Sequence, residues 1–149
     1  MNELSRKSAG FTLIEMMIVI VVVGILLMVA LPGYERQTLK TKRSLGRAEL
    51  QEVMARQEQY FVNNRQYATS LVDLGLANPY SIDADANDVD TSSGDRIYTI
   101  ALPSATALTY TLTATPQLGQ VKDTLCGTLQ ITSTGVKSAS GTGGAAQCW

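Results

Sequence analysis

A long apolar stretch near the amino terminus most constrains what this chain can fold into. It runs from Phe11 to Leu31, and only Thr12, Glu15 and Gly24 interrupt it. As an α-helix, a stretch of this length extends for roughly 30 Å, which is the thickness of the hydrocarbon core of a bilayer. The sequence therefore predicts a helix that can span a membrane.

Glu15 is the unusual residue of this stretch. An ionisable side chain inside a membrane is costly unless it has a partner, so it marks a functional site by default. The other explanation is that Glu15 lies close enough to the lipid headgroups to remain hydrated. Taken alone, the apolar stretch leaves both explanations open.

Basic residues indicate which side of the membrane each end occupies. Arg6 and Lys7 precede the apolar stretch, so the positive-inside rule keeps the short amino-terminal end in the cytoplasm and exports the rest. The basic group from Arg36 to Arg47 opposes this orientation weakly. Residues 1–10 are expected to be a leader. Because residues 28–33 match a signal-peptidase site poorly, we expect cleavage before the apolar stretch, which then stays attached.

The remainder of the 149-residue chain is enough for one small domain. The chain has no histidine, which removes the commonest general base and the commonest metal ligand. A net charge of −1 argues against a dedicated nucleic-acid surface. No Gly-rich phosphate loop, CxxC pair or nucleophile with its base is found in the sequence. We therefore expect neither an enzyme nor a cofactor or metal requirement.

A second apolar pattern predicts that the helix continues from near Tyr34 to near Phe61. The residues that recur at helical spacing are Leu50, Val53, Met54, Gln57, Tyr60 and Phe61. We expect Tyr60 and Phe61 to belong to the core rather than to a ligand site. Pro32 would then lie inside a nearly continuous helix, where it removes a hydrogen bond and produces a kink.

Three later segments alternate apolar and polar residues, over 97–102, 109–114 and 128–132. Such alternation predicts an antiparallel sheet with one buried face, which we expect to pack on the helix. The fold class is therefore α+β, with a long amino-terminal helix, half of it transmembrane, on a small antiparallel sheet. We expect a loop-rich connection from Tyr67 to Asp95, and a weakly hydrophobic tail from Ser138 to Gln147.

The acidic segment from Asp83 to Asp90 begins like an EF-hand calcium loop, with oxygen ligands at alternate positions. However, Asp88 stands where that loop needs its glycine, and Gly94 stands where it needs the bidentate glutamate. We expect a solvated acidic loop, with calcium binding as the alternative.

Two cysteines, Cys126 and Cys148, lie in the part predicted to be exported. An even pair in an oxidising compartment predicts a disulfide, and two buried thiols are the alternative. On the chain-entropy account, closing this loop stabilises the domain by about 3 kcal/mol.

The motif Gly10-Phe11-Thr12-Leu13-Ile14-Glu15, followed at once by a long apolar stretch, closely resembles that of type IV prepilins. The resemblance implies that a prepilin peptidase cuts between Gly10 and Phe11 and that the new amine of Phe11 is N-methylated. It also implies that Glu15 pairs with the Phe11 amine of a neighbouring subunit during assembly. Gly24 and Pro32 fall where that family has its helix-softening glycine and proline. Lys7 is two residues removed from Gly10, where many members have an adjacent basic residue.

The rest of the chain resembles PilE-type minor pilins of the type IVa pilus. The matching positions include Tyr60, Phe61, Asn64, Tyr67, Leu74 to Leu76, Tyr110 to Pro116, Gln120, Asp123, Gly127, Leu129, Gly135 and Lys137. In that family the two cysteines, here Cys126 and Cys148, enclose a disulfide-bounded region. The implied organisation is a leader over 1–10, a transmembrane and filament-core segment over 11–33, and a periplasmic head over 34–149.

This resemblance implies a structural subunit of a type IV pilus, more specifically a minor pilin that helps to prime assembly and lies in the tip complex. Its implied partners are other pilin subunits, the prepilin peptidase and methyltransferase, and the assembly platform of the inner membrane. The subunit would be stored in that membrane and then enter the extracellular pilus. Such pili serve adhesion, twitching motility or DNA uptake.

Four alternatives remain. A major pilin shares the motif, and so does a type II secretion pseudopilin, although major pseudopilins usually carry a calcium loop and lack the terminal cysteine pair. A DNA-receptor pilin would need a basic stripe on the head, because phosphate contacts dominate affinity. The head instead sets Arg65, Arg96, Lys122 and Lys137 against Asp73, Asp123 and five loop aspartates. A membrane-anchored enzyme lacks any nucleophile with its base.

Overall fold

The computed structural model describes residues 11–149, apart from the side chains at positions 29 and 32. The predicted leader over residues 1–10 lies outside the described part. The chain divides into two compact units, one that ends at Gln37 and a head formed by Thr38–Trp149.

One long helix, α1 (Leu13–Asn64), contains both helical segments that the sequence predicts. Up to Gln37, every large apolar side chain for which the structure gives an exposure is exposed, from Phe11 to Tyr34. By length and composition, the amino-terminal part of α1 is apolar enough to cross a membrane. α1 ends at Asn64, close to the end near Phe61 that the sequence predicts.

Within the head, the predicted stripe of α1 faces the core from Leu50 to Gln57. Tyr60 and Phe61, which we expected in the core, are only partly buried and lie outside it. Leu50, Val53 and Gln57 are fully buried, and Met54 packs at the edge of the core. One turn earlier, the stripe contains a glycine. A Cβ atom at Gly46 would lie 3.0 Å from the ring of Tyr98, so the absence of a side chain lets this aromatic residue pack directly on the helix.

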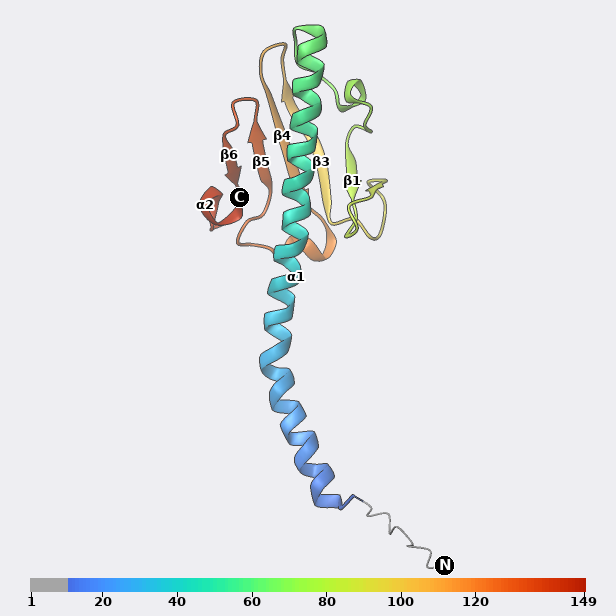
Figure 1. Cartoon of the computed structure of the whole chain (residues 1–149), viewed down its shortest axis with the longest axis vertical. Coiled ribbons are helices and arrows are strands. Elements are labelled where there is room, and N and C mark those ends of the chain that lie inside the picture. Colours follow the sequence, from blue (N-terminus) through green and yellow to red (C-terminus); the bar gives the residue numbers. More distant parts are fainter. Residues whose placement is uncertain (1–10) are drawn as a thin grey trace, which may run out of the picture. The chain divides into compact units, whose positions relative to one another are not determined.

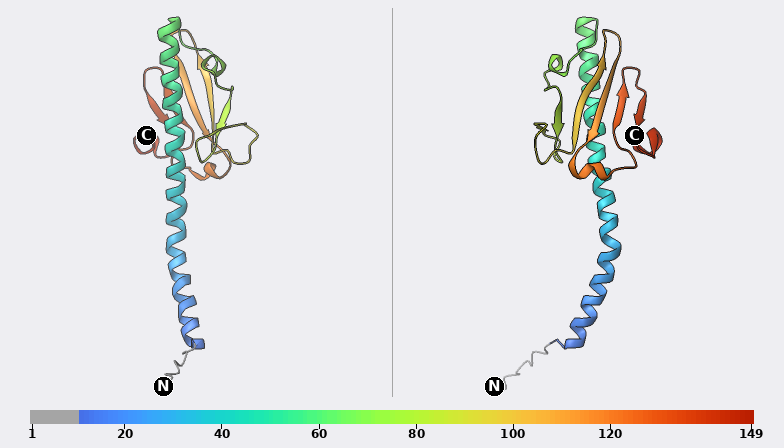
Figure 2. Two further views of the ribbon diagram at one scale, coloured as in Figure 1. Left: turned by 45° about the vertical axis from the view of Figure 1, so that its right-hand side comes forward. Right: turned by 180° about the vertical axis from the view of Figure 1, so that it is seen from behind.

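The sheet has six strands in the order β2-β1-β3-β4-β5-β6, and all neighbours are antiparallel. The strands are β1 (Tyr80–Ile82), β2 (Asp88–Val89), β3 (Tyr98–Ala105), β4 (Tyr110–Pro116), β5 (Leu129–Thr132) and β6 (Lys137–Ala139). In the views of Figures 1 and 2, α1 crosses one face of this sheet within the head, and no helix covers the other face.

Three of these strands, β3, β4 and β5, are those that the sequence predicts. On β4, Tyr110, Leu112 and Ala114 are buried, and the residues between them are partly exposed. This alternation is expected because successive side chains of a strand point to opposite faces, and only one face of this sheet is covered. β3 departs from it beyond Ala101, where its register with β4 shifts before pairing resumes at Ser104.

The prediction of only three strands is wrong, because three short strands extend the sheet at its two edges. β1 and β2 lie in the segment that we expected to be loop-rich, together with a short 3-10 helix, η1 (Leu71–Leu74). All three residues of β1 are buried, and the strand is too short to repeat an alternation of apolar and polar residues. Leu71 and Leu76 of this segment are buried in the core, and Leu74 packs against it.

The weakly hydrophobic carboxyl-terminal tail also forms regular structure. β6 pairs with β5 in a register that sets Ala139 opposite Leu129, and a short helix, α2 (Gly144–Cys148), follows. Neither element has an apolar pattern of its own. Backbone pairing and the covalent bond at Cys148 hold them in place.

Candidate functional site

The start of α1 is held by a reciprocal contact between Thr12 and Glu15. The Glu15 backbone N–H donates to Oγ1 of Thr12 at 3.3 Å, and the Thr12 backbone N–H donates to Oε2 of Glu15 at 3.4 Å. This is the capping box, in which a threonine and a glutamate three residues later satisfy the free N–H groups of a helix start. The T-x-x-E signature is present in the sequence, but the explanations that we considered for Glu15 concern its charge and not helix capping.

Because of this contact, the Glu15 carboxylate has a hydrogen-bond donor even in the isolated subunit. One carboxylate oxygen has a partner within its own chain, and the other is available to a second donor. Phe11 is exposed, with 76% of its surface accessible. Gly10, on the other side of the predicted cleavage site, lies outside the described residues.

Gly24 lies within the apolar part of α1. A Cβ atom built there meets no neighbour within 4 Å, so nothing in the described part of this chain requires a glycine at this position. Pro32 also lies within α1. Any requirement for Gly24 therefore arises from the softness of the helix or from packing against another molecule.

At the other end of the chain, a disulfide joins Cys126 to Cys148, as the sequence predicts. Both residues are fully buried in the head core. Beside the bond, Nε1 of Trp149 donates to the carbonyl oxygen of Ser138 at 2.8 Å, and Nζ of Lys137 lies 5.1 Å from the centre of the Trp149 ring. The disulfide therefore closes a small subdomain of β5, β6 and α2 on the edge of the sheet.

A buried ion pair joins α1 to the connection between β4 and β5. The guanidinium group of Arg43 donates to both carboxylate oxygens of Asp123 at 2.7 Å, and the two side chains are only 9% and 2% exposed. Nε2 of Gln120 donates to the Leu39 carbonyl oxygen and to the Tyr98 hydroxyl, both at 3.1 Å. Burial raises the pKa of Tyr98 to about 12.

This network was not predicted from the sequence, because Arg43 is interpreted there only as one member of the basic group from Arg36 to Arg47. A signal was nevertheless present in the sequence. Arg43 lies seven residues before Leu50, on the same helix face, and Gly46 lies seven before Val53. A cation on a buried face requires a carboxylate partner.

A second polar contact links α1 to β1. The hydroxyl of Tyr80 donates to a carboxylate oxygen of Glu49, which is half-buried between them. Burial raises the pKa of Glu49, and the hydrogen bond from Tyr80 partly opposes this shift.

The acidic loop between β1 and β3 does not converge on a cation site in the described residues, in which no group of three or more Asp, Glu, Cys or His side chains is placed to hold a metal ion. Asp83 instead organises its own loop. Its carboxylate accepts hydrogen bonds from the backbone N–H groups of Asp85 and Asn87 and from the Asn87 side chain. The bonds from Asn87 hold the pKa of Asp83 below its usual range.

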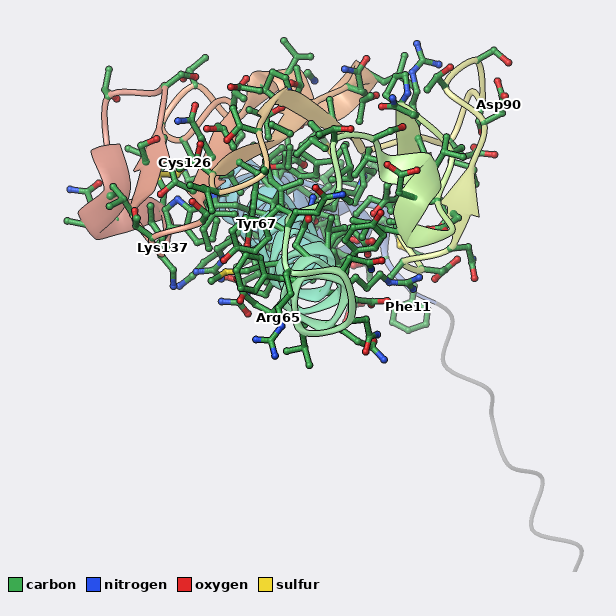
Figure 3. The ribbon with its side chains drawn as sticks, turned by 90° about the horizontal axis from the view of Figure 1, so that it is seen from above. Phe11, Arg65, Tyr67, Asp90, Cys126 and Lys137 are labelled. Carbon is green, nitrogen blue, oxygen red and sulfur yellow. A yellow bond between two sulfur atoms is a disulfide. The ribbon has the colours of Figure 1, made fainter. Side chains whose placement is uncertain are left out.

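Charge is unevenly distributed over the head. Residues 97–149 contain a single carboxylate side chain, that of Asp123, which is buried against Arg43. The same residues include two exposed lysines, Lys122 and Lys137. The acidic loop lies beside β1, and in Figure 3 Asp90 is at the opposite side of the head from Cys126 and Lys137. One side of the head is therefore acidic, and the carboxyl-terminal segment that includes the disulfide has no exposed side-chain carboxylate of its own.

Comparison with protein families gives two matches that together extend from residue 5 to residue 130. Residues 5–31 match the prokaryotic N-terminal methylation motif. Residues 32–130 match the family described as "Type IV minor pilin ComP, DNA uptake sequence receptor".

Several curated proteins are similar over part of the chain. The major pilin PilE1 of Neisseria gonorrhoeae is 37% identical over 81 residues, which are 54% of this chain and 47% of that protein. The major pilin PilA of Myxococcus xanthus is 29% identical over 76 residues, or 51% and 34% of the two chains. The wide-pilus component PilA4 of Thermus thermophilus is 34% identical over 74 residues, or 48% and 56%. The chain thus spans about half, or less, of the length of these relatives.

A long helix with an apolar amino-terminal part and a head built on an antiparallel sheet defines the class of pilin-like subunits. The chain belongs to the type IV pilin family. Proteins of this family are structural subunits of pili rather than enzymes. The methylation motif implies processing by a prepilin peptidase.

Proposed function

We propose that this chain is a minor pilin, which helps to prime assembly of a type IV pilus and lies in its tip complex. The observation that carries the proposal is the match of residues 32–130, most of the head, to a family of minor pilins. The relatives PilE1 and PilA are major pilins, but their similarity covers about half of this chain.

The proposed processing and assembly of the subunit follow from its amino-terminal motif. Residues 1–10 form the leader, residues 11–33 the membrane and filament-core segment, and residues 34–149 the periplasmic head. The peptidase cuts between Gly10 and Phe11 on the cytoplasmic side, and the Phe11 amine is methylated. Glu15 then accepts the charged Phe11 amine of a neighbouring subunit, because a paired carboxylate in an apolar environment is far less costly than an unpaired one. Gly24 and Pro32 soften the helix during this transfer.

Two substitutions separate this assembly role of Glu15 from its role in capping. Glu15→Gln keeps the capping box, which accepts glutamine, but removes the charge. Thr12→Ala disrupts the capping box and keeps the carboxylate. We expect E15Q to be absent from sheared pili and T12A to be present, by quantitative mass spectrometry. The opposite pattern would show that helix capping alone explains Glu15.

Copy number tests the minor-pilin proposal itself. In sheared pili, we expect this chain at a small fraction of the abundance of the main subunit. Deleting its gene should reduce piliation strongly, although the main subunit is still made. If this chain is instead the most abundant pilin of the filament, it is the major subunit and the proposal fails.

A second candidate function, DNA reception, is favoured by the same family match, which is described as a receptor for DNA uptake sequences. Lys122 and Lys137 both belong to residues 117–149, a segment with no exposed side-chain carboxylate of its own, so DNA phosphates would meet least repulsion on the surface that this segment forms. Only two lysines contribute, so binding through them would be weak, with a log–log salt slope of only about −2.

Duplex DNA titrated against the purified chain at several salt concentrations tests this function. Binding through the surface of residues 117–149 predicts a log–log salt slope that becomes less steep by about one unit in K137Q. Arg65→Gln, at the far end of α1, serves as the matched control for loss of a cation. An equal effect of both substitutions, or no binding at low salt, would contradict DNA reception at this surface.

A further inference from the structure

The connection between β4 and β5 exposes three large apolar side chains within eight residues. It contains a 3-10 helix, η2 (Leu118–Lys122), and we name residues 118–125 the base loop. Leu118, Val121 and Leu125 are 48%, 58% and 41% exposed. Exposed apolar clusters of this kind mark surfaces that contact a protein or a membrane.

The backbone of the base loop is arranged so that this exposure is retained. Leu118 has φ of 47°, in the left-handed region that a leucine seldom adopts. The neighbouring side chains Gln120 and Asp123 point inward instead, into the network with Arg43. Inward polar and outward apolar side chains reverse the usual arrangement of a surface loop. A strained residue that presents an apolar side chain to solvent is a reason to look for a binding role.

The base loop is fastened to the part of the head where α1 enters. Gln120 donates to the carbonyl oxygen of Leu39, and Asp123 pairs with Arg43 one turn later. Figure 1 shows η2 at this end of the head. Every contact of this attachment lies within the head.

The chain itself keeps this end of the head close to the membrane while the subunit is stored there. The segment from Leu31, where the apolar stretch ends, to Leu39 is about 12 Å long as a helix. Fully extended, it would reach about 28 Å at most. Whatever the orientation of the head, the base loop therefore lies within reach of the headgroup layer.

We propose that the base loop contacts the membrane surface in the stored subunit, with Leu118, Val121 and Leu125 inserted at the boundary between headgroups and hydrocarbon. The occupant of this apolar surface is thus the bilayer in which the same chain is anchored. The proposal rests on the membrane anchorage of the pilin and not on its being a minor subunit. On assembly, the surface leaves the lipid and becomes available to the filament.

Charge does not select anionic lipid at this surface. Lys122 is exposed beside the apolar side chains, and Lys42 lines a cavity next to Leu118. Asp83 and Asp95 line the same cavity. Because cations and carboxylates lie side by side there, we expect the contact to form on zwitterionic lipid and to depend on the apolar side chains.

Fluorescence quenching by brominated lipid tests the proposal on the full chain in phosphatidylcholine vesicles. Trp149 is the single tryptophan of the chain, so V121W in a W149F background places one reporter in the base loop. L108W in the same background is the matched control, because Leu108 is a 72% exposed apolar residue in the turn between β3 and β4. L125W provides a second base-loop reporter in case V121W fails to fold.

We expect brominated lipid to remove about half of the emission of V121W or L125W and less than about a tenth of that of L108W. Equal quenching of the base-loop and control reporters would overturn the proposal. A second outcome would also overturn it. If quenching of the base-loop reporter is lost when more protein is added per lipid, a second copy of the chain covers the loop in preference to lipid.

Discussion

Removing the carboxylate of Asp123 should destabilise the head more than any other single change to a polar side chain considered above. Asp123→Ala leaves the Arg43 guanidinium group buried, with both of its 2.7 Å hydrogen bonds lost. Loss of one partner of a buried ion pair costs about 3–5 kcal/mol, against a typical domain stability of about 5–15 kcal/mol. For a head of this size, that loss lowers the melting temperature by roughly 12–20 °C.

Guanidinium denaturation of the full chain in detergent, followed by the fluorescence of Trp149, measures this effect. The matched variant replaces both partners, as R43M with D123L, and removes the stranded charge. We expect it to recover most of the lost stability, because apolar residues often replace a buried pair at little cost. A loss below about 1 kcal/mol for D123A would refute the reasoning, since water would then be solvating Arg43. A double variant as unstable as D123A would also refute it.

Three further perturbations test other contacts of the head. Replacing Cys126 and Cys148 together by serine should cost about 3 kcal/mol of unfolding free energy, compared with the oxidised parent in the same denaturation assay. E49Q should remove one component of the pH dependence of stability. Because the folded-state pKa of Glu49 is raised above about 4.5, the contribution of this residue to stability is fully present below that pH and is lost as pH rises through the folded pKa. G46A should cost about 1–3 kcal/mol because its new methyl group meets the Tyr98 ring at 3.0 Å, and an unchanged melting temperature would show that the ring moves freely aside.

Much of the head could be predicted because its pattern is periodic. The stripe through Leu50 and Val53 and the alternation through Leu112 and Ile131 each repeat several times, so the apolar face can be identified without knowing its partner. The long helix and the central strands β3, β4 and β5 follow from these repeats. The disulfide could be predicted because the chain has an even number of cysteines, both in the part predicted to be exported to an oxidising compartment.

The edge strands β1, β2 and β6 could not be predicted in the same way, because they are too short to repeat a pattern. Their positions depend on pairing with strands that are distant in sequence, such as Ser138 of β6 opposite Gln130 of β5. The pairing of Arg43 with Asp123 likewise joins residues 80 positions apart. Periodicity could place Arg43 on the buried face, but it could not identify the partner.

The mass of the intact protein, recovered from its native membrane without reductant, tests the central claim most directly. The account predicts a species that begins at Phe11, is one methyl group heavier than the unmodified chain, and is two hydrogens lighter because Cys126 and Cys148 are joined. A mass that still includes residues 1–10 would contradict the account. The chain would then be an uncleaved membrane anchor, and Glu15 would serve its own helix rather than a neighbouring subunit.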